Sequence, residues 1–154
     1  MKSAEERTAA AGIELPPAVA PFGAYVEAVR TGNLLFLTGM MPTVGHEAKF
    51  RGRIGEELDA EQGRLAAYTA ALNALAVARE HLGSLDKVSR VVRLGVYLAT
   101  AGEPVNMPKV ADGASELLRD VFGEEKMSAR LVIGVASLPL GVPVELELIF
   151  EVTS

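Results

Sequence analysis

Residues 88–99 constrain the fold more than any other part of the chain. Their side chains alternate with period two, which is typical of a β-strand, and both alternating faces are fairly apolar. A strand of this kind is usually covered on both faces of its sheet. Residues 59–82 and 108–122, on either side in the sequence, carry apolar residues at helical spacing. The chain therefore predicts a sheet on which helices pack.

The clearest helix is expected over residues 59–82. Asp59 and Gln62 have the spacing of a capping box, in which the two residues satisfy each other's backbone N–H groups. Gly83 stands where a helix commonly ends. The helix is rich in alanine, and such a helix packs closely on a sheet.

Short apolar runs predict the other strands, at residues 25–30, 34–40, 130–136 and 144–151. Thr31-Gly32-Asn33 has the composition of a tight hairpin loop between the first two. The order is strand, strand, helix, strand, helix, strand, strand. This order predicts an α+β sandwich with a mixed sheet of about six strands and two helices on one face. The other face then has no cover within the chain, and its apolar residues favour an oligomer.

The chain of 154 residues is expected to form a single domain over residues 1–154, with residues 1–20 as an N-terminal lead-in. Pro16, Pro17 and Pro21 disfavour a helix through the lead-in. The charged N-terminus lacks the apolar core of a signal peptide, and no apolar segment is long enough to span a bilayer. We therefore expect a cytoplasmic protein without a membrane partner.

Composition argues against several classes of function. The net charge is −5 and only 5% of residues are aromatic, whereas nucleic-acid binders need a basic face and stacking rings. The chain has no cysteine and no Gly-x-Ser-x-Gly elbow, and its glycines near residues 52–55 lack the other residues of a phosphate-binding loop. His46 and His81 are far apart in the sequence and neither has a second ligand at metal-binding spacing. No metal site is expected.

Two charged residues in the apolar C-terminal part attract attention. Arg130 opens a strand, and a guanidinium there needs an anion, a carboxylate or a ligand. It can make a structural ion pair with Glu147 or Asp112, or it can anchor the carboxylate of a small anionic substrate. Glu145 can be an ordinary solvent-facing glutamate or a general base that orients a water molecule. Residue chemistry alone leaves both alternatives open.

The geometry expected for the last two strands bears on these alternatives. If they form a hairpin that turns near residues 139–140, Arg130 pairs near position 149 or 150. Glu145 then lies about 15 Å away at the usual rise of a strand. The two side chains would share a site only across a subunit boundary or through a gap of substrate size.

Three sets of residues, in order along the chain, resemble the reactive-intermediate deaminase family, also called RidA, YjgF-like or L-PSP endoribonuclease-like proteins. The first is Gly23-Ala24-Tyr25-Val26, and the second is the run from Thr31 to Gly39 followed by Pro42. The third combines Ala129-Arg130, Leu138-Pro139 and the run from Val144 to Glu147. The residue types at positions 110–115 and 138–141 resemble those of a divergent YjgF-like branch.

The resemblance implies a chorismate-mutase-like fold, a homotrimer, and sites in the clefts between subunits. It implies hydrolysis of reactive 2-imino and enamino acids to 2-keto acids and ammonia, without a cofactor or metal. By the same resemblance, Arg130 holds the substrate carboxylate and Glu145 orients water or relays a proton. Tyr25 lines the cleft, and Gly39 lies at its wall.

Three residues depart from the family pattern near the expected site. Asp112 stands about where the family often has an asparagine, and it can repel an anionic substrate or pair with Arg130. Leu131 follows the arginine where a small hydroxyl residue is common, and Met40 replaces a polar residue. A drier pocket and a larger or more apolar substrate are expected. The alternatives are a trimeric module that binds carboxylates or proteins without turnover and, less favoured by charge, an endoribonuclease.

Overall fold

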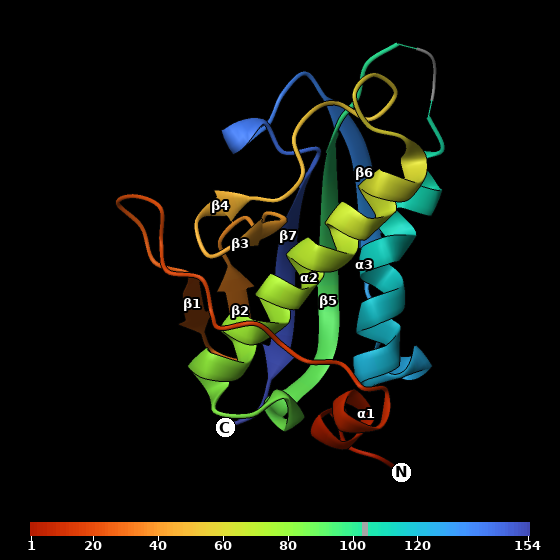
Figure 1. Ribbon diagram of the computed structural model, residues 1–154. Coiled ribbons are helices and arrows are strands. Elements are labelled where there is room, and N and C mark those ends of the chain that lie inside the picture. Colours follow the sequence, from red (N-terminus) through yellow and green to blue (C-terminus); the bar gives the residue numbers. More distant parts are fainter. Residues whose placement is uncertain (103–104) are drawn as a thin grey trace.

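The computed structural model describes residues 1–102 and 105–154, and its centre is a five-stranded sheet (Figure 1). The strand order is β1-β2-β7-β5-β6, and only the β5–β6 pair is parallel. A separate two-stranded sheet is formed by β3 and β4. The strands are β1 Ala28–Thr31, β2 Leu34–Leu37, β3 Thr43–Val44, β4 Glu47–Ala48, β5 Val88–Ala99, β6 Ala129–Val135 and β7 Val144–Val152. The predicted α+β class and mixed sheet are confirmed, and the main sheet has five strands instead of about six.

Two long helices, α2 (Ala60–Leu82) and α3 (Met107–Phe122), cover one face of the sheet (Figure 1). The predicted capping box is present: Asp59 Oδ1 accepts from Gln62 N at 2.8 Å, and Gln62 Oε1 accepts from Asp59 N at 2.9 Å. Gly83 ends α2 in the left-handed region, with φ of 86°. Short 3₁₀ turns follow at Leu85–Lys87, Glu124–Lys126 and Pro139–Gly141.

The core lies between this helix pair and alternate residues of β5 and β7. Its largest fully buried side chains include Leu94 and Leu98 of β5 and Leu146, Leu148 and Phe150 of β7. The alternation predicted for residues 144–151 is therefore observed, with the glutamates on the opposite face. Burying these side chains provides the main stabilising contribution to the fold.

The two helices approach each other closely because small residues meet at their contact. Most of the buried residues of α2 are alanines. On α3, a Cβ atom at Gly113 would overlap the backbone carbonyl of Arg64. This close approach fixes the rotation of α3 about its axis, and therefore determines which of its residues face β6.

The expected hairpin between the last two strands is wrong. β6 pairs in parallel with β5, and β7 lies on the other side of β5. The physical reason is that β5, α3 and β6 form a strand–helix–strand crossover, which returns the chain parallel to its first strand. Residues 139–141 therefore carry the chain from one side of β5 to the other.

The lead-in also differs from expectation, because it contains a helix, α1 (Ala4–Ala10). Ser3 caps this helix by accepting a hydrogen bond from Glu6 N, and the Glu5 carboxylate accepts one from Arg79 of α2 at 2.9 Å. The prolines restrict only their own neighbourhood, which begins after the helix has ended.

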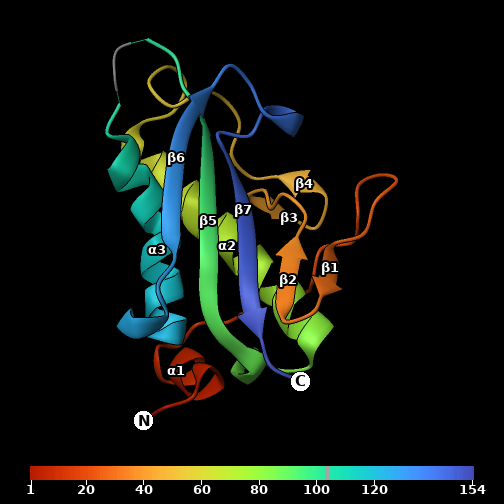
Figure 2. The same ribbon diagram turned by 180° about the vertical axis from the view of Figure 1, so that it is seen from behind.

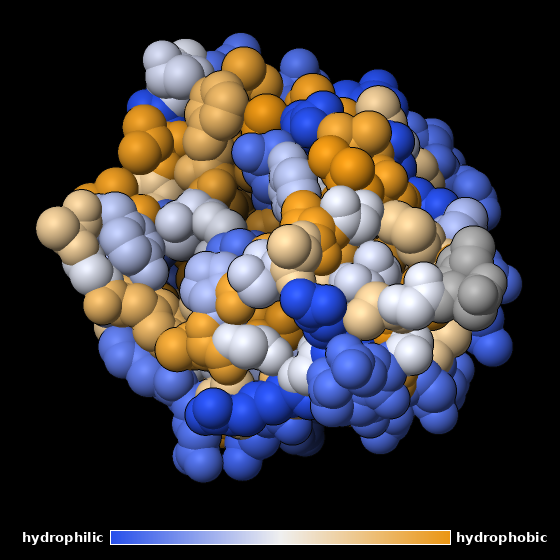
Figure 3. Space-filling model, turned by 90° about the horizontal axis from the view of Figure 1, so that it is seen from above, coloured by the Kyte–Doolittle hydropathy of each residue, from blue (hydrophilic) through white to orange (hydrophobic). Residues whose placement is uncertain are grey.

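None of the helices that the structure describes covers the second face of the sheet (Figure 2). Val29, Phe36, Leu131 and Ile133 share this face by their strand register, and each is between 37% and 53% exposed. In the view from above, hydrophobic residues form several patches, most of them in the upper half, with hydrophilic residues between them and around much of the rim (Figure 3). An apolar open face is the surface that the sequence predicts for an oligomer.

Candidate functional site

A hollow of about 300 Å³ on the open face of the sheet contains the Glu145 carboxyl group. Glu145 is half-buried on β7, and burial raises the pKa of its carboxyl group. Gly39 forms the wall beside it, because a Cβ at that position would overlap the carboxylate. The lining residues are Leu37, Gly39, Tyr97, Leu138, Glu145, Leu146 and Glu147.

The two glutamates of this hollow differ in their partners. The Glu147 carboxylate accepts from Arg93 Nε at 3.1 Å and from the Tyr97 hydroxyl at 3.5 Å. Among residues 1–102 and 105–154, Glu145 forms no ion pair and no side-chain hydrogen bond. Glu145 is therefore the carboxyl group that is available to a ligand in this hollow.

Tyr25 lies on the other side of the Gly39 wall. Both residues line a second, narrower hollow, in which the Tyr25 hydroxyl accepts a hydrogen bond from Phe22 N at 2.8 Å. Tyr25 is 43% exposed, and the nearby Phe22 ring stacks on His46 with ring centroids 4.1 Å apart. The structure therefore brings Tyr25, Gly39 and Glu145 into one region.

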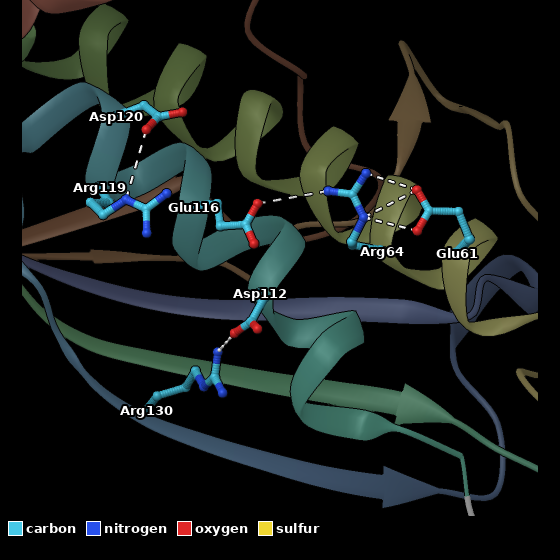
Figure 4. A network of polar contacts seen from close by, with 7 residues as sticks. All are labelled: Glu61, Arg64, Asp112, Glu116, Arg119, Asp120 and Arg130. Carbon is cyan, nitrogen blue, oxygen red and sulfur yellow. Dashed lines mark hydrogen bonds and ion pairs between the residues drawn. The ribbon is translucent and has the colours of Figure 1, made fainter.

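Arg130 lies elsewhere, in a hollow of about 340 Å³ between α3 and the start of β6. Its Nη1 donates to Asp112 Oδ1 at 2.7 Å, as Figure 4 shows, and to Ser115 Oγ at 3.1 Å. Of the two ion-pair partners expected from the sequence, Asp112 is the one observed, because Glu147 pairs with Arg93. The hollow is lined by Asp112, Ser115, Glu116, Arg119, Glu124, Met127, Ser128 and Arg130.

Arg130 and Glu145 lie on opposite faces of the sheet within one chain. Arg130 is in register with Leu94, whose side chain is under the helices, whereas Glu145 is in register with Tyr97 on the open face. An offset of three residues along the strands and two strands across separates their Cα atoms by about 14 Å. Leu131, next to Arg130, is on the open face. The two residues are apart, as expected, but because of the parallel strand and not because of a hairpin.

Sequence reasoning missed two residues that shape these hollows, Ser115 and Tyr97. Ser115 follows Asp112 by three positions, and that spacing places both on one side of a helix, so the helical period could have indicated it. Tyr97 of β5 contacts Glu147 of the neighbouring strand β7, and only the strand register reveals this contact.

Within the described part of the chain, no group of three or more histidine, aspartate or glutamate residues is arranged to hold a metal ion. Over the same residues, no helix is long and apolar enough to cross a membrane.

The raised pKa of Glu145 predicts a pH-dependent change in stability. Because the native state holds this proton to a higher pH than the unfolded chain, the contribution of this group is full below its ordinary pKa of 4.5 and is lost as the pH rises through the raised value. Glu145→Gln, which cannot ionise, should therefore melt at an increasingly higher temperature than the wild type as the pH rises from about 4 to about 8.

Melting curves recorded by circular dichroism across this pH range measure the difference. Glu151→Gln, an exposed glutamate on the same strand, is the matched control and should show no such trend. A difference in Tm between Glu145→Gln and the wild type that stays constant with pH would contradict the prediction.

A family model described as "YjgF/chorismate mutase-like, putative endoribonuclease" matches residues 5–152. The chain belongs to this family. Protein TCP17 of Trypanosoma cruzi is 38% identical to it over 144 residues, which cover 93% of this chain and 90% of that protein. The family that the sequence motifs resemble is therefore confirmed.

Solved structures place the chain in a divergent branch of the YjgF family. A Shewanella oneidensis MR-1 protein with the same endoribonuclease designation is 30% identical, with a TM-score of 0.92 over 98% of this chain and 100% of that one. A protein of unknown function from Agrobacterium tumefaciens is 34% identical, with a TM-score of 0.88 over 97% and 92%. RidA from the Antarctic bacterium Psychrobacter sp. is 25% identical, with a TM-score of only 0.63 over 90% and 97%.

Proposed function

We propose that this YjgF-family protein hydrolyses reactive 2-imino and enamino acids to 2-keto acids and ammonia, in clefts between the subunits of a homotrimer. The observation that carries the proposal is Glu145, a half-buried carboxyl group with a raised pKa and no partner among the described residues, held against Gly39 in an open hollow. A carboxyl group whose pKa is raised by burial holds a proton more readily than an ordinary glutamate, and this suits a group that takes and returns protons.

The second part of the proposed site, Arg130, comes from a neighbouring subunit. β6 is the edge strand of the sheet, and it carries Arg130 together with the exposed Leu131 and Ile133. Burying these apolar residues against the open face of a second chain would stabilise the oligomer. Arg130 lies on the helix side of the same edge strand, so a second chain that wraps around this edge would bring its Glu145 hollow to the guanidinium, which one chain alone cannot do.

The residues suit the chemistry of imine hydrolysis. Arg130 binds the substrate carboxylate, and Glu145 takes a proton from water as the water oxygen adds to the imine carbon. Glu145 passes this proton to the nitrogen, which gives an intermediate that carries both a hydroxyl and an amino group. The hydroxyl group then gives up its own proton, by way of Glu145, to the departing nitrogen as its oxygen forms the keto C=O. The carbon–nitrogen bond breaks, and the products are ammonia and a 2-keto acid. Tyr25 and Gly39 form the wall beside the reacting carbon. Holding the substrate and the water in a reactive geometry can supply much of the rate enhancement of a hydrolysis of this kind.

One observation favours a second function, the binding of a keto acid or other carboxylate without turnover. Arg130 already has a carboxylate partner in its own chain, Asp112, at 2.7 Å. An arginine that holds this structural pair is also compatible with a binding or interaction module. The endoribonuclease activity in the family description is less favoured, because a net charge of −5 repels the phosphates of RNA.

Ammonia and keto acid release from imines generated by an amino-acid dehydratase tests the proposal. The wild type should release both products faster than the uncatalysed background, and Arg130→Ala should raise KM by about tenfold to hundredfold, because a charge-assisted bidentate contact is lost. Thr31→Ala, an exposed substitution on β1, is the control. No release from several amino-acid imines, with tight binding of keto acids, would instead support the binding module, and RNA cleavage lost in Arg130→Ala would support the nuclease.

A further inference from the structure

A hollow of about 230 Å³ lies between two loops beside the Glu145 hollow. One loop follows β4 and contributes residues 51–53, and the other is the turn at residues 137–142. A hydrogen bond from Gly52 N to Gly141 O, at 2.9 Å, joins the two loops. Both ribbon views show them at the end of the molecule where β5 ends and β7 begins (Figure 1 and Figure 2). The reaction proposed above makes no use of this hollow.

The charged lining of this hollow is cationic. Among the residues that the structure describes, it consists of Arg51 and Arg53, which give a formal charge of +2. Within the same residues, neither guanidinium forms an ion pair or a hydrogen bond, and the Glu57 carboxylate accepts instead from the backbone N–H of Arg53 at 2.8 Å. Two guanidinium groups on one hollow attract an anion, and each can bind a carboxylate through two parallel hydrogen bonds.

The turn that closes the hollow contains a strained residue. Leu140 has a φ of 60°, and over residues 1–102 and 105–154 it is the only residue other than glycine with a positive φ. Its side chain is 42% exposed, so burial does little to offset the strain. Strained backbone of this kind clusters at ligand-binding sites. Residues 138–141 are also among those whose types resemble the divergent branch, which makes this turn a feature of the branch.

The hollow lined by Arg51 and Arg53, called the Arg51 hollow below, is next to the Glu145 hollow, and Leu138 lines both. Tyr97 of β5 lines the Glu145 hollow, and Ala99, two residues later, lines the Arg51 hollow. Alternate residues of a strand lie on one face, about 7 Å apart. The two hollows therefore follow one another along the open face, and a ligand at Glu145 can reach the second hollow with a short side chain.

We infer that the Arg51 hollow binds a second carboxylate at the far end of the substrate side chain, so that the protein prefers 2-imino acids with an acidic side chain. The inference rests on the proposed function, in which the reacting carbon lies at Glu145. Acidic amino acids give such imines, and their side chains end in a carboxylate. The sequence predicted a larger or more apolar substrate, and the two arginines favour one that is larger and anionic at its far end.

Equilibrium binding without turnover tests the inference. The probes are two keto acids of equal chain length: 2-oxoglutarate carries a second carboxylate, and 2-oxopentanoate ends in a methyl group. Each is titrated into the full-length protein by calorimetry at about 0.15 M salt, where exposed charges are screened beyond about 8 Å. The wild type should bind 2-oxoglutarate more tightly. The double variant Arg51→Gln with Arg53→Gln should lower this preference by about tenfold, because charge-assisted hydrogen bonds are lost.

Lys49→Gln is the matched control, because Lys49 is an exposed cation on the same loop and does not line the hollow. It should leave the ratio of the two dissociation constants within about twofold of the wild type. The inference is overturned if the wild type binds both probes equally or prefers 2-oxopentanoate. It is also overturned if the double variant keeps the preference, if Lys49→Gln lowers it as much, or if neither probe binds.

Failure of this inference is distinguishable from failure of the proposed function. The matched imines are generated from L-glutamate and L-norvaline by an amino-acid oxidase, and ammonia release is measured for each. If both are hydrolysed with equal kcat/KM, the function stands and the second carboxylate site is wrong. If the binding preference is observed and is lost in the double variant, but neither imine is hydrolysed, the site stands and the protein is a binding module.

Discussion

Replacing Glu145 by glutamine should lower kcat for imine hydrolysis by about 10²- to 10⁴-fold, the usual contribution of a general acid–base group. Glutamine has nearly the same shape and can fill the hollow beside Gly39, but it cannot take a proton from water or return one to the leaving nitrogen. KM should change little, because the carboxylate of the substrate is bound by Arg130. The loss should therefore appear in kcat, and kcat/KM should fall by the same factor.

Steady-state measurement of ammonia release, with the folded state verified by circular dichroism, gives both constants. Glu151→Gln is again the matched control, since Glu151 is an exposed glutamate on the same strand and lies outside the hollow, and it should retain wild-type kcat. If Glu145→Gln kept more than about a tenth of wild-type kcat, proton transfer by Glu145 would be excluded as the source of the rate.

Local patterns in the sequence predicted the elements of the fold well. The capping box of Asp59 and Gln62, the stop at Gly83 and the alternation of residues 144–151 each depend on neighbours within a few positions, and each is observed. The hairpin loop between β1 and β2 is observed for the same reason, with Thr31 paired to Leu34. Such short-range interactions can be predicted because the residues that form them are close together in the sequence.

The pairing of strands was harder to predict because it depends on distant parts of the chain. β6 and β7 are both apolar strands, and each could pair with β5 or with the other. The local pattern therefore does not distinguish a hairpin from a crossover. The face on which a side chain lies follows from register, and a shift of one residue reverses it. The sequence therefore identified Arg130 and Glu145 as candidates, but not that they lie on opposite faces of the sheet.

Asp112 illustrates the same limit in the candidate site. The sequence indicated Asp112 as one of two partners for Arg130, and the observed contact also requires the rotation of α3 that turns Asp112 toward β6. That rotation is fixed by Gly113, which contacts the backbone of α2. A glycine in the middle of a helix gives no local sign that it faces another helix.

Gly113→Ala should therefore destabilise the protein, although alanine normally favours a helix over glycine by about 1 kcal/mol. The added Cβ would overlap the carbonyl oxygen of Arg64, and backbone cannot move aside as a flexible side chain can. Separating α2 and α3 to make room should cost about 2 kcal/mol net, as overpacking of a close-packed core usually does. For a chain of this length, that lowers Tm by roughly 4–8 °C.

Urea unfolding at constant pH measures the free energy of unfolding, and Lys109→Ala, an exposed substitution on the same helix, should change it by less than about 0.5 kcal/mol. A Gly113→Ala protein as stable as the wild type would show that the helix contact is not close.

The same substitution should also change the candidate site, although Gly113 is not part of it. Because Gly113 lies between Asp112 and Ser115, moving α3 away from α2 shifts both partners of the Arg130 guanidinium. KM should then be higher than that of the wild type even at temperatures well below Tm, where the variant is still folded. Such a rise would link the packing of the two helices to the binding of the substrate carboxylate.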